Sequence, residues 1–317
     1  MKYEEKKTAN YAGKKDNTLL YGTILLLAVG FFILIGLVFV FAGSGSFGMG
    51  KCIGIVEISD EITTASIPPS LFTEGTPGSE DIANAISSIN KRDDIASVVF
   101  VINSPGGSVV GSREIYDSIK EVKQPKVAYF REVAASGGYY VSAATDYIIS
   151  DPNALTGSIG VVTTTSDMSA MLEKIGINIT NIATGKHKDI GAFNRPMDNE
   201  EYAIIQGLLN ETFQEFVGVV LEGRKGKLNL EKFEQILDGR VLTGRQAKEI
   251  GLVDALGTKK DAIEKAAALG GLTNDESKIC MIKAVPQGSD GSALGLESFI
   301  NKLIANSNKK KIGLNFE

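Results

Sequence analysis

The sequence predicts an α/β protein with a mainly parallel β-sheet, preceded by one N-terminal transmembrane helix. Downstream of residue 50, runs with strand character alternate with helical segments, which is typical of parallel strands joined by crossover helices. The run SVVFVIN at 97–103 is apolar in the way expected of a strand buried on both faces. The chain of 317 residues is long enough to bury a sizeable core.

The N-terminal part is dominated by an apolar run at 19–42, LLYGTILLLAVGFFILIGLVFVFA. At ~1.5 Å per residue, a helix of this length crosses the ~30 Å hydrocarbon core of a bilayer. A cleaved signal peptide is the alternative, but its apolar region would be only about 7–15 residues long. The AGSGS after the run matches a cleavage site only loosely. We therefore expect a transmembrane anchor at 19–42.

The charges on the two flanks predict the orientation of this anchor. Lysines precede the run at positions 2, 6, 7, 14 and 15, whereas only Lys51 follows it closely. Positively charged flanks stay in the cytoplasm. We expect residues 1–18 to form a cytoplasmic segment and the bulk of the chain to lie outside the cytoplasm, tethered to the cell membrane.

Composition excludes several classes of function. The net charge of −5 and the absence of Trp argue against nucleic-acid binding. Two cysteines, Cys52 and Cys280, are too few for a zinc site. We expect unpaired buried thiols, although an oxidising compartment would allow them to pair. No phosphate-binding loop of the Gly-x4-Gly-Lys-Ser/Thr type is present, so we expect no nucleotide, other cofactor or metal.

Sequence patterns predict the elements of the domain at 51–286. Apolar or β-branched runs indicate strands at 52–58, 97–103, 126–130, 146–150, 159–162 and 278–285. Apolar residues at helical spacing indicate helices at 81–90, 109–122, 198–222 and 261–269, with two shorter ones within 231–250. Residues 63–79, rich in Pro, Gly, Ser and Thr, form a loop.

The C-terminal residues 287–317 are expected to form a tail. Its last residues, KKKIGLNFE, are basic and end in apolar side chains. Such a segment could dock in a groove of the protein, but a solvated end is the favoured interpretation.

Ser136 lies in VAASGGYY, at a predicted turn from strand 126–130 into a helix. At such a turn the hydroxyl projects outward, near the free N–H groups and partial positive charge of the helix start. Gly137 and Gly138 would let another backbone approach closely, as an extended substrate requires. The alternative is an ordinary helix N-cap serine.

The segment SPGGS at 104–108 lies at the carboxyl end of the preceding parallel strand, where ligands bind in α/β sheets. Gly106 and Gly107 would expose backbone N–H groups that can hold an oxyanion. A tight turn into a helix would explain the same residues. Because two such turns follow successive strands, we predict that they share a cleft.

A serine nucleophile needs a base. The single histidine, His187, lies in TGKHKDIG, where Lys186 and Lys188 are the other candidates. A lysine acts as a base only when neutral, and lowering a lysine pKa from ~10.4 to about 7 costs roughly 4–5 kcal/mol in the charged form. Burial supplies that cost and a hydroxyl could orient the amine, whereas Asp189 would oppose the shift if it faced the amine.

Four segments in order, NSPGG, ASGGYY, TGSIGV and GKHKDI, resemble signal peptide peptidase A. This family comprises membrane-bound serine proteases with the Clp-protease/crotonase fold of repeated β-α units. GRVLTGRQAKEIGLVDALG resembles the segment that follows its catalytic core. The resemblance covers about residues 52–285 and implies a serine peptidase domain at 51–286.

The resemblance also implies roles for individual residues. Ser136 matches the nucleophile, Lys188 the general base, and Ser158 of TGSIGV the serine that orients the lysine. Gly107, with help from Gly106, matches the oxyanion loop. The histidine of GKHKDI then becomes a bystander.

The chain resembles the short form of the family, which has one copy of the fold. In that form the subunits assemble into a homo-oligomeric ring and a neighbour supplies the lysine, so the dyad is shared between subunits. The resemblance implies that the protein degrades cleaved signal peptides and similar apolar peptides through an acyl-enzyme. Two alternatives remain: a quality-control protease for membrane or secreted proteins, and a non-catalytic crotonase-like binding protein.

Overall fold

The computed structural model describes residues 51–70, 75–273 and 278–286, together with residues 27, 29–31 and 33. The chain divides into two compact units, residues 1–49 and 50–317, and the description below concerns the second. The predicted tail at 287–317 and all but those few residues of the predicted anchor lie outside the described residues. Within the part of the chain that is described, no helix is both long enough and apolar enough to span a bilayer.

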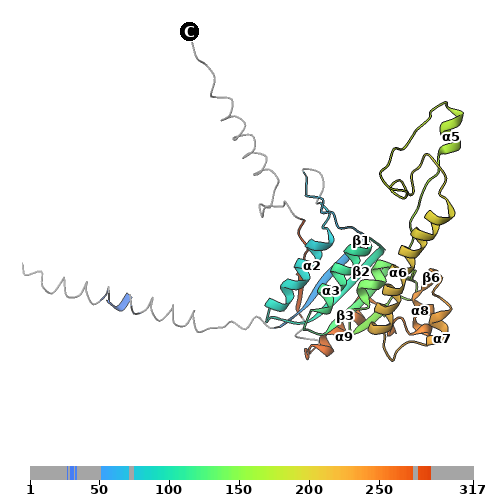
Figure 1. Ribbon diagram of the computed structural model, residues 1–317. Helices are drawn as coiled ribbons and strands as arrows, with labels where there is room; N and C mark the ends of the chain where they lie inside the picture. The colour runs from blue at the N-terminus through green and yellow to red at the C-terminus, as the bar shows by residue number, and fades with distance from the viewer. Residues whose placement is uncertain are drawn as a thin grey trace, which may run out of the picture. The chain divides into compact units, whose positions relative to one another are not determined.

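The domain is built on one eight-stranded sheet with the order β6-β5-β3-β2-β1-β8, in which β4 pairs with β3, and β7 with β4. The paired strands β1, β2 and β3 are labelled in Figure 1. All the pairs are parallel except β5 with β6. The strands are β1 (Cys52–Ile62), β2 (Ile95–Gly107), β3 (Lys126–Ala135), β4 (Tyr147–Ser150), β5 (Leu155–Gly157), β6 (Val241–Thr243), β7 (Ala255–Leu256) and β8 (Lys278–Ile282). The predicted α/β class with a mostly parallel sheet is confirmed.

Helices cover both faces of this sheet. They are α2 (Ser79–Ser87), the 3-10 helix η1 (Ser88–Lys91), α3 (Val109–Lys120), α4 (Gly137–Ser142), α5 (Ser169–Lys174), α6 (Asn199–Gly223), α7 (Leu230–Glu234), α8 (Gly244–Ile250) and α9 (Lys259–Leu269). One core cluster joins α2, α3, α4 and part of α6 to one face, and a second joins α9 to the other. Helices α2, α3, α4 and α9 therefore bury apolar side chains against the sheet, whereas α5 has no buried residue.

Strand β2 shows why the middle of the sheet is apolar on both faces. Side chains alternate along a strand, so Val98, Phe100 and Ile102 enter one cluster while Val99 and Val101 enter the other. All five are at most 3% exposed. The prediction of a strand buried on both faces is confirmed.

Two local predictions were wrong. Residues 159–162, predicted as a strand, are irregular, and the strand of this region is β5, just upstream. The cysteines do not remain free: Cys52 on β1 and Cys280 on β8 form a disulfide with a Cα–Cα distance of 5.9 Å. The pair forms because β8 lies beside β1, with Cys280 opposite Gly54.

The residues between the sheet and α6 form an excursion that we call the arm, residues 161–198. None of the arm residues is buried. The arm contains α5 and extends away from the sheet (Figure 1). It returns at Asp198, which caps α6 by accepting from the backbone N–H of Glu201 at 2.8 Å, while Glu201 accepts in return from the N–H of Asp198.

Candidate active site

Ser136 has a backbone conformation that few non-glycine residues adopt, with φ 50° and ψ −122°. A residue in such a sparsely populated region costs about 1–3 kcal/mol and persists only where its surroundings enforce it. Two backbone hydrogen bonds of 2.9 Å do so here: the N–H of Ser136 donates to Gly157 O, and the N–H of Tyr140 donates to Ser136 O. The Ser136 hydroxyl makes no capping bond to α4, so an N-cap role does not explain this serine.

Close backbone packing joins the Ser136 turn to the SPGGS turn. A Cβ on Gly106, at φ 98°, would lie 2.5 Å from the backbone nitrogen of Gly137 and 2.9 Å from Ser136 Cβ. A Cβ on Gly137 would lie 2.3 Å from Ser112 Oγ. A side chain at either position would displace a neighbouring group, so the two glycines allow the turns to pack closely. The shared cleft predicted from the two turns is present.

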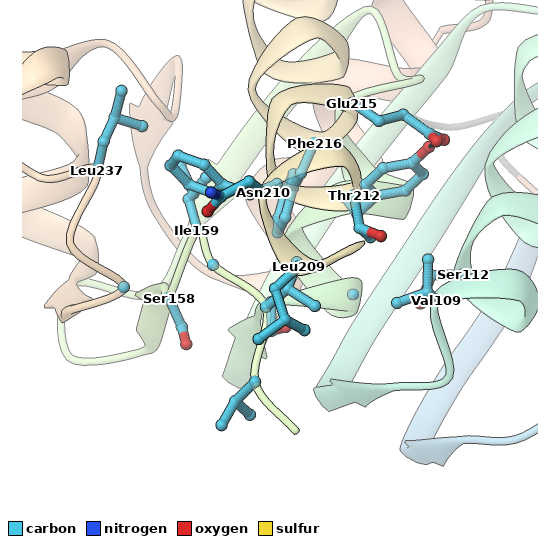
Figure 2. Close-up of a pocket in the computed structure, with 18 of the residues that line it drawn as sticks. Val109, Ser112, Ser158, Ile159, Leu209, Asn210, Thr212, Glu215, Phe216 and Leu237 are labelled. Carbon is cyan, nitrogen blue, oxygen red and sulfur yellow. Dashed lines mark hydrogen bonds between the residues drawn. The ribbon is translucent and has the colours of Figure 1, made fainter. Parts of the chain in front are cut away.

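The cleft is a cavity of about 550 Å³. Its polar lining includes Ser136, Ser158 and the Gly107 backbone. Its apolar lining comes from several elements: Val109, Ile159, Val162, Leu209, Phe213, Phe216 and Leu237. In Figure 2 the α6 side chains Leu209 and Phe216 lie between Ser158 with Ile159 on one side and Val109 with Ser112 on the other.

Ser158 is positioned by the same sheet as Ser136. Ala135 and Gly157 are opposite each other at the carboxyl ends of the paired parallel strands β3 and β5, so the residues that follow them reach the cavity together. Ser158 also has a left-handed φ of 49°, and its N–H donates to Arg240 O at 2.9 Å. The serine is half-buried.

The two glycines of the predicted oxyanion loop differ in their surroundings. Gly107 lines the cavity with a φ of 149°. The N–H of Gly106 is engaged elsewhere, since it donates to Ser104 Oγ at 3.1 Å. In this arrangement Gly107 is the better placed of the two to meet a substrate oxygen.

Lys188 is in the arm, exposed, and does not line the cavity. Its N–H closes a turn onto Gly185 O at 3.1 Å. His187 is not at the cavity either, and its Nε2 lies 3.2 Å from Glu200 Oε1 at the start of α6. Among the described residues, the cavity lining thus includes both predicted serines and Gly107 but no lysine or histidine.

The cavity wall also includes residues that the sequence analysis did not assign to the site. Ser112 on α3 is 3% exposed, and its Oγ has no hydrogen-bond partner among the described residues. The Tyr140 hydroxyl donates to Glu215 Oε1 at 3.0 Å, and burial together with Glu215 raises the pKa of Tyr140. The apolar stripe of α6 was a sequence signal for this wall, but it predicts a core face equally well.

Residues 118–273 match the model of peptidase family S49. The chain is 40% identical over 195 residues to a candidate protease of Methanocaldococcus jannaschii, covering 61% of this chain and 62% of that protein. It is 34% identical over 197 residues to a candidate signal peptide peptidase of Enterococcus faecium, covering 61% and 57%. It is 35% identical over 195 residues to the chloroplastic serine protease SPPA of Arabidopsis thaliana, covering 59% and 28%.

The chain is of the signal peptide peptidase A type. The family predicted from the four motifs is confirmed. The chain spans less than two thirds of the length of each of these relatives. The part that matches family S49 contains Ser136, Ser158 and Lys188, whereas the Gly106–Gly107 turn precedes it.

Proposed function

We propose that this protein is a membrane-anchored serine endopeptidase that degrades cleaved signal peptides and similar apolar peptides. The observation that carries the proposal is the environment of Ser136. This serine, between β3 and α4, has a strained backbone, makes no capping bond to α4 and lines a cavity with an apolar wall. Membership in a peptidase family supports the activity, and the two turns at the carboxyl ends of adjacent parallel strands support a Clp-protease/crotonase-like fold.

In the proposed reaction, Ser136 Oγ attacks the peptide carbonyl and gives its proton to the neutral amine of Lys188. The N–H of Gly107 stabilises the oxyanion that forms. The protonated lysine then donates to the leaving amine, which departs and leaves an acyl-enzyme. A water molecule, deprotonated by the same lysine, hydrolyses the ester and regenerates Ser136. The Ser158 hydroxyl orients the Lys188 amine throughout.

We propose further that the lysine comes from a second copy of the chain, in a ring-shaped homo-oligomer. The Lys188 turn is tied to the first residues of α6, whereas Phe216 of the same helix lines the cavity. At 1.5 Å per residue, the cavity wall on α6 extends from Gln206, about 8 Å of helix rise beyond Glu201, to Phe216, about 22 Å beyond it. Lys188 does not line this wall, and its exposed side chain is available to a neighbouring copy.

The surface of the arm supports this assembly. It exposes large apolar side chains that a monomer would leave in water: Val162, Met168, Met171, Ile175, Ile177, Ile182 and Phe193. A lysine transferred from water into a neighbour's cavity loses hydration, which favours the neutral form that a base requires.

We propose that catalysis takes place outside the cytoplasm, with residues 19–42 as the anchor and 1–18 in the cytoplasm. The lysine-rich flank supports this orientation. The Cys52–Cys280 disulfide supports it independently, because such bonds persist in oxidising compartments. An anchored protease would meet apolar peptides at the membrane surface.

The test is peptidase activity of the full chain in detergent on an apolar, signal-like peptide. We expect Ser136→Ala and Lys188→Ala to lower kcat by at least about 10³-fold, while His187→Ala and the exposed control Ser88→Ala remain active. If His187→Ala is inactive and Lys188→Ala is active, His187 is the base. A folded wild-type oligomer that is inert towards every peptide favours a crotonase-like binding protein. Preferential cleavage of unfolded membrane proteins would favour the quality-control alternative.

A further inference from the structure

Arg195 links the Lys188 turn to the start of α6. We propose that Arg195 is a positioning residue that holds this turn in one orientation, so that Lys188 is presented in a fixed direction to the cavity of a second copy. The inference rests on the proposed function of Lys188 as a base and adds a residue that supports that role.

The guanidinium of Arg195 contacts two carboxylates at once. Its Nε and Nη2 donate to Asp189 Oδ2 at 3.0 Å and Oδ1 at 2.8 Å, a bidentate pair with the residue that follows Lys188. Its Nη1 donates to Glu201 Oε2 at 2.8 Å, and Nη2 bonds the other oxygen of Glu201. A planar fork of five donors suits this double contact, and a lysine could not reproduce it.

The Glu201 end of this linkage is fixed. The Glu201 side chain is 3% exposed, and it accepts from the N–H of Asp198 in the capping box of α6. Asp189 is held from the other side by Asn181, whose Nδ2 donates to Asp189 Oδ2 at 3.0 Å. The hydrogen bonds of Arg195 lower the pKa of both carboxyl groups, so both stay ionised at neutral pH.

Glu200 holds the other side of the same turn. It lies 3.2 Å from His187 Nε2 and also pairs with Lys186. The residues on both sides of Lys188 therefore contact the first turn of α6, His187 directly and Asp189 through Arg195, while the Lys188 side chain is exposed. The Asp189 carboxylate is bonded to Arg195 and is therefore not directed at the Lys188 amine.

A fixed turn matters because polar contacts, and not a buried apolar core, order this part of the arm. None of the residues at 185–198 is buried, so no apolar core holds the lysine backbone. A misplacement of about 1 Å in a catalytic group costs on the order of 10²-fold in rate. Loss of Arg195 should therefore lower kcat and leave KM nearly unchanged.

The experiment uses two full-length subunits with different affinity tags, co-expressed and purified through both tags. Ser136→Ala subunits supply only Lys188, and Lys188→Ala subunits supply only Ser136. Arg195→Ala is added to one subunit type at a time. We expect a kcat at least about 10-fold lower when it is on the lysine donor and within about 2-fold of the parent mixture when it is on the serine donor. Arg195→Lys on the lysine donor should recover part of the loss.

Arg92→Ala, which removes an arginine–aspartate pair outside the arm, is the matched control and should leave the mixture unchanged. Equal losses on both subunit types, or no loss on either, would overturn the positioning role. An inactive parent mixture with an active wild type would overturn only the sharing between subunits. In that case the positioning role is tested with Arg195→Ala in the wild-type background. A fall in kcat at constant KM supports the role, and an unchanged kcat overturns it. An active Lys188→Ala homo-oligomer would overturn both proposals.

Discussion

The Cys52–Cys280 disulfide leads to a stability prediction whose size follows from the fold. The bond joins residues separated by 228 positions and fastens the edge strand β8 to β1. In the chain-entropy model, a loop of this length is worth about 5 kcal/mol at 25 °C. For a domain of this size each kcal/mol corresponds to roughly 2–4 °C in Tm. The Cys52→Ser/Cys280→Ser variant should therefore melt roughly 10–20 °C below the wild type.

The assay is thermal unfolding of both proteins, followed by circular dichroism with and without a thiol reductant. Reductant should lower the Tm of the wild type to that of the double variant and leave the variant unaffected. A difference in Tm under about 2 °C would refute this reasoning. It would show that the bond does not restrict the part of the chain that unfolds in the measured transition, as when β8 detaches before the rest of the domain. Two titratable thiols in unreduced, denatured wild type would refute the bond itself.

Three further predictions concern the site and its supports. Gly137→Ala places a Cβ 2.3 Å from Ser112 Oγ, so it should lower kcat/KM by about 10²-fold without unfolding the protein, and Ser112→Gly should restore part of this loss. Arg195 lowers the pKa of Glu201 from 4.5 to about 2, so the stability that this carboxylate contributes is present above pH 4.5 and is lost as the pH falls towards 2; Glu201→Gln should flatten the fall of Tm in that window. Replacing Arg224, which is 1% exposed and paired with Asp254, by Met should lower the free energy of unfolding in urea by less than the about 3–5 kcal/mol of a fully broken buried pair, because Lys227 still contacts Asp254 at 3.0 Å.

The serine half of the site could be predicted from local sequence patterns. Apolar runs followed by glycine-rich turns place Ser136 and the Gly106–Gly107 turn at the carboxyl ends of parallel strands. Because such ends lie along one edge of a sheet, their proximity follows from topology. Ser158 was assigned through the family resemblance, and the pairing of β5 with β3 supplies the physical reason why it lies in the same cavity.

The lysine half and the disulfide could not be predicted in this way. The residues of GKHKDI carry no signal for their attachment to α6, which depends on ion pairs of Arg195 with Asp189 and Glu201 and of Glu200 with Lys186. The neighbour of β8 is also set by non-local pairing, so the spacing of Cys52 and Cys280 gave no indication of a bond. The stripe on α6 predicted burial, but not that Phe216 would line the cavity.

Covalent labelling can establish whether Ser136 is an activated nucleophile. The full-length protein is treated with a fluorophosphonate probe, and the modified residue is identified by mass spectrometry. We expect a single adduct on Ser136, formed much more slowly in the Lys188→Ala variant and absent from Ser136→Ala. A folded wild-type oligomer that takes up no probe, or an adduct that persists in Ser136→Ala, would contradict this expectation.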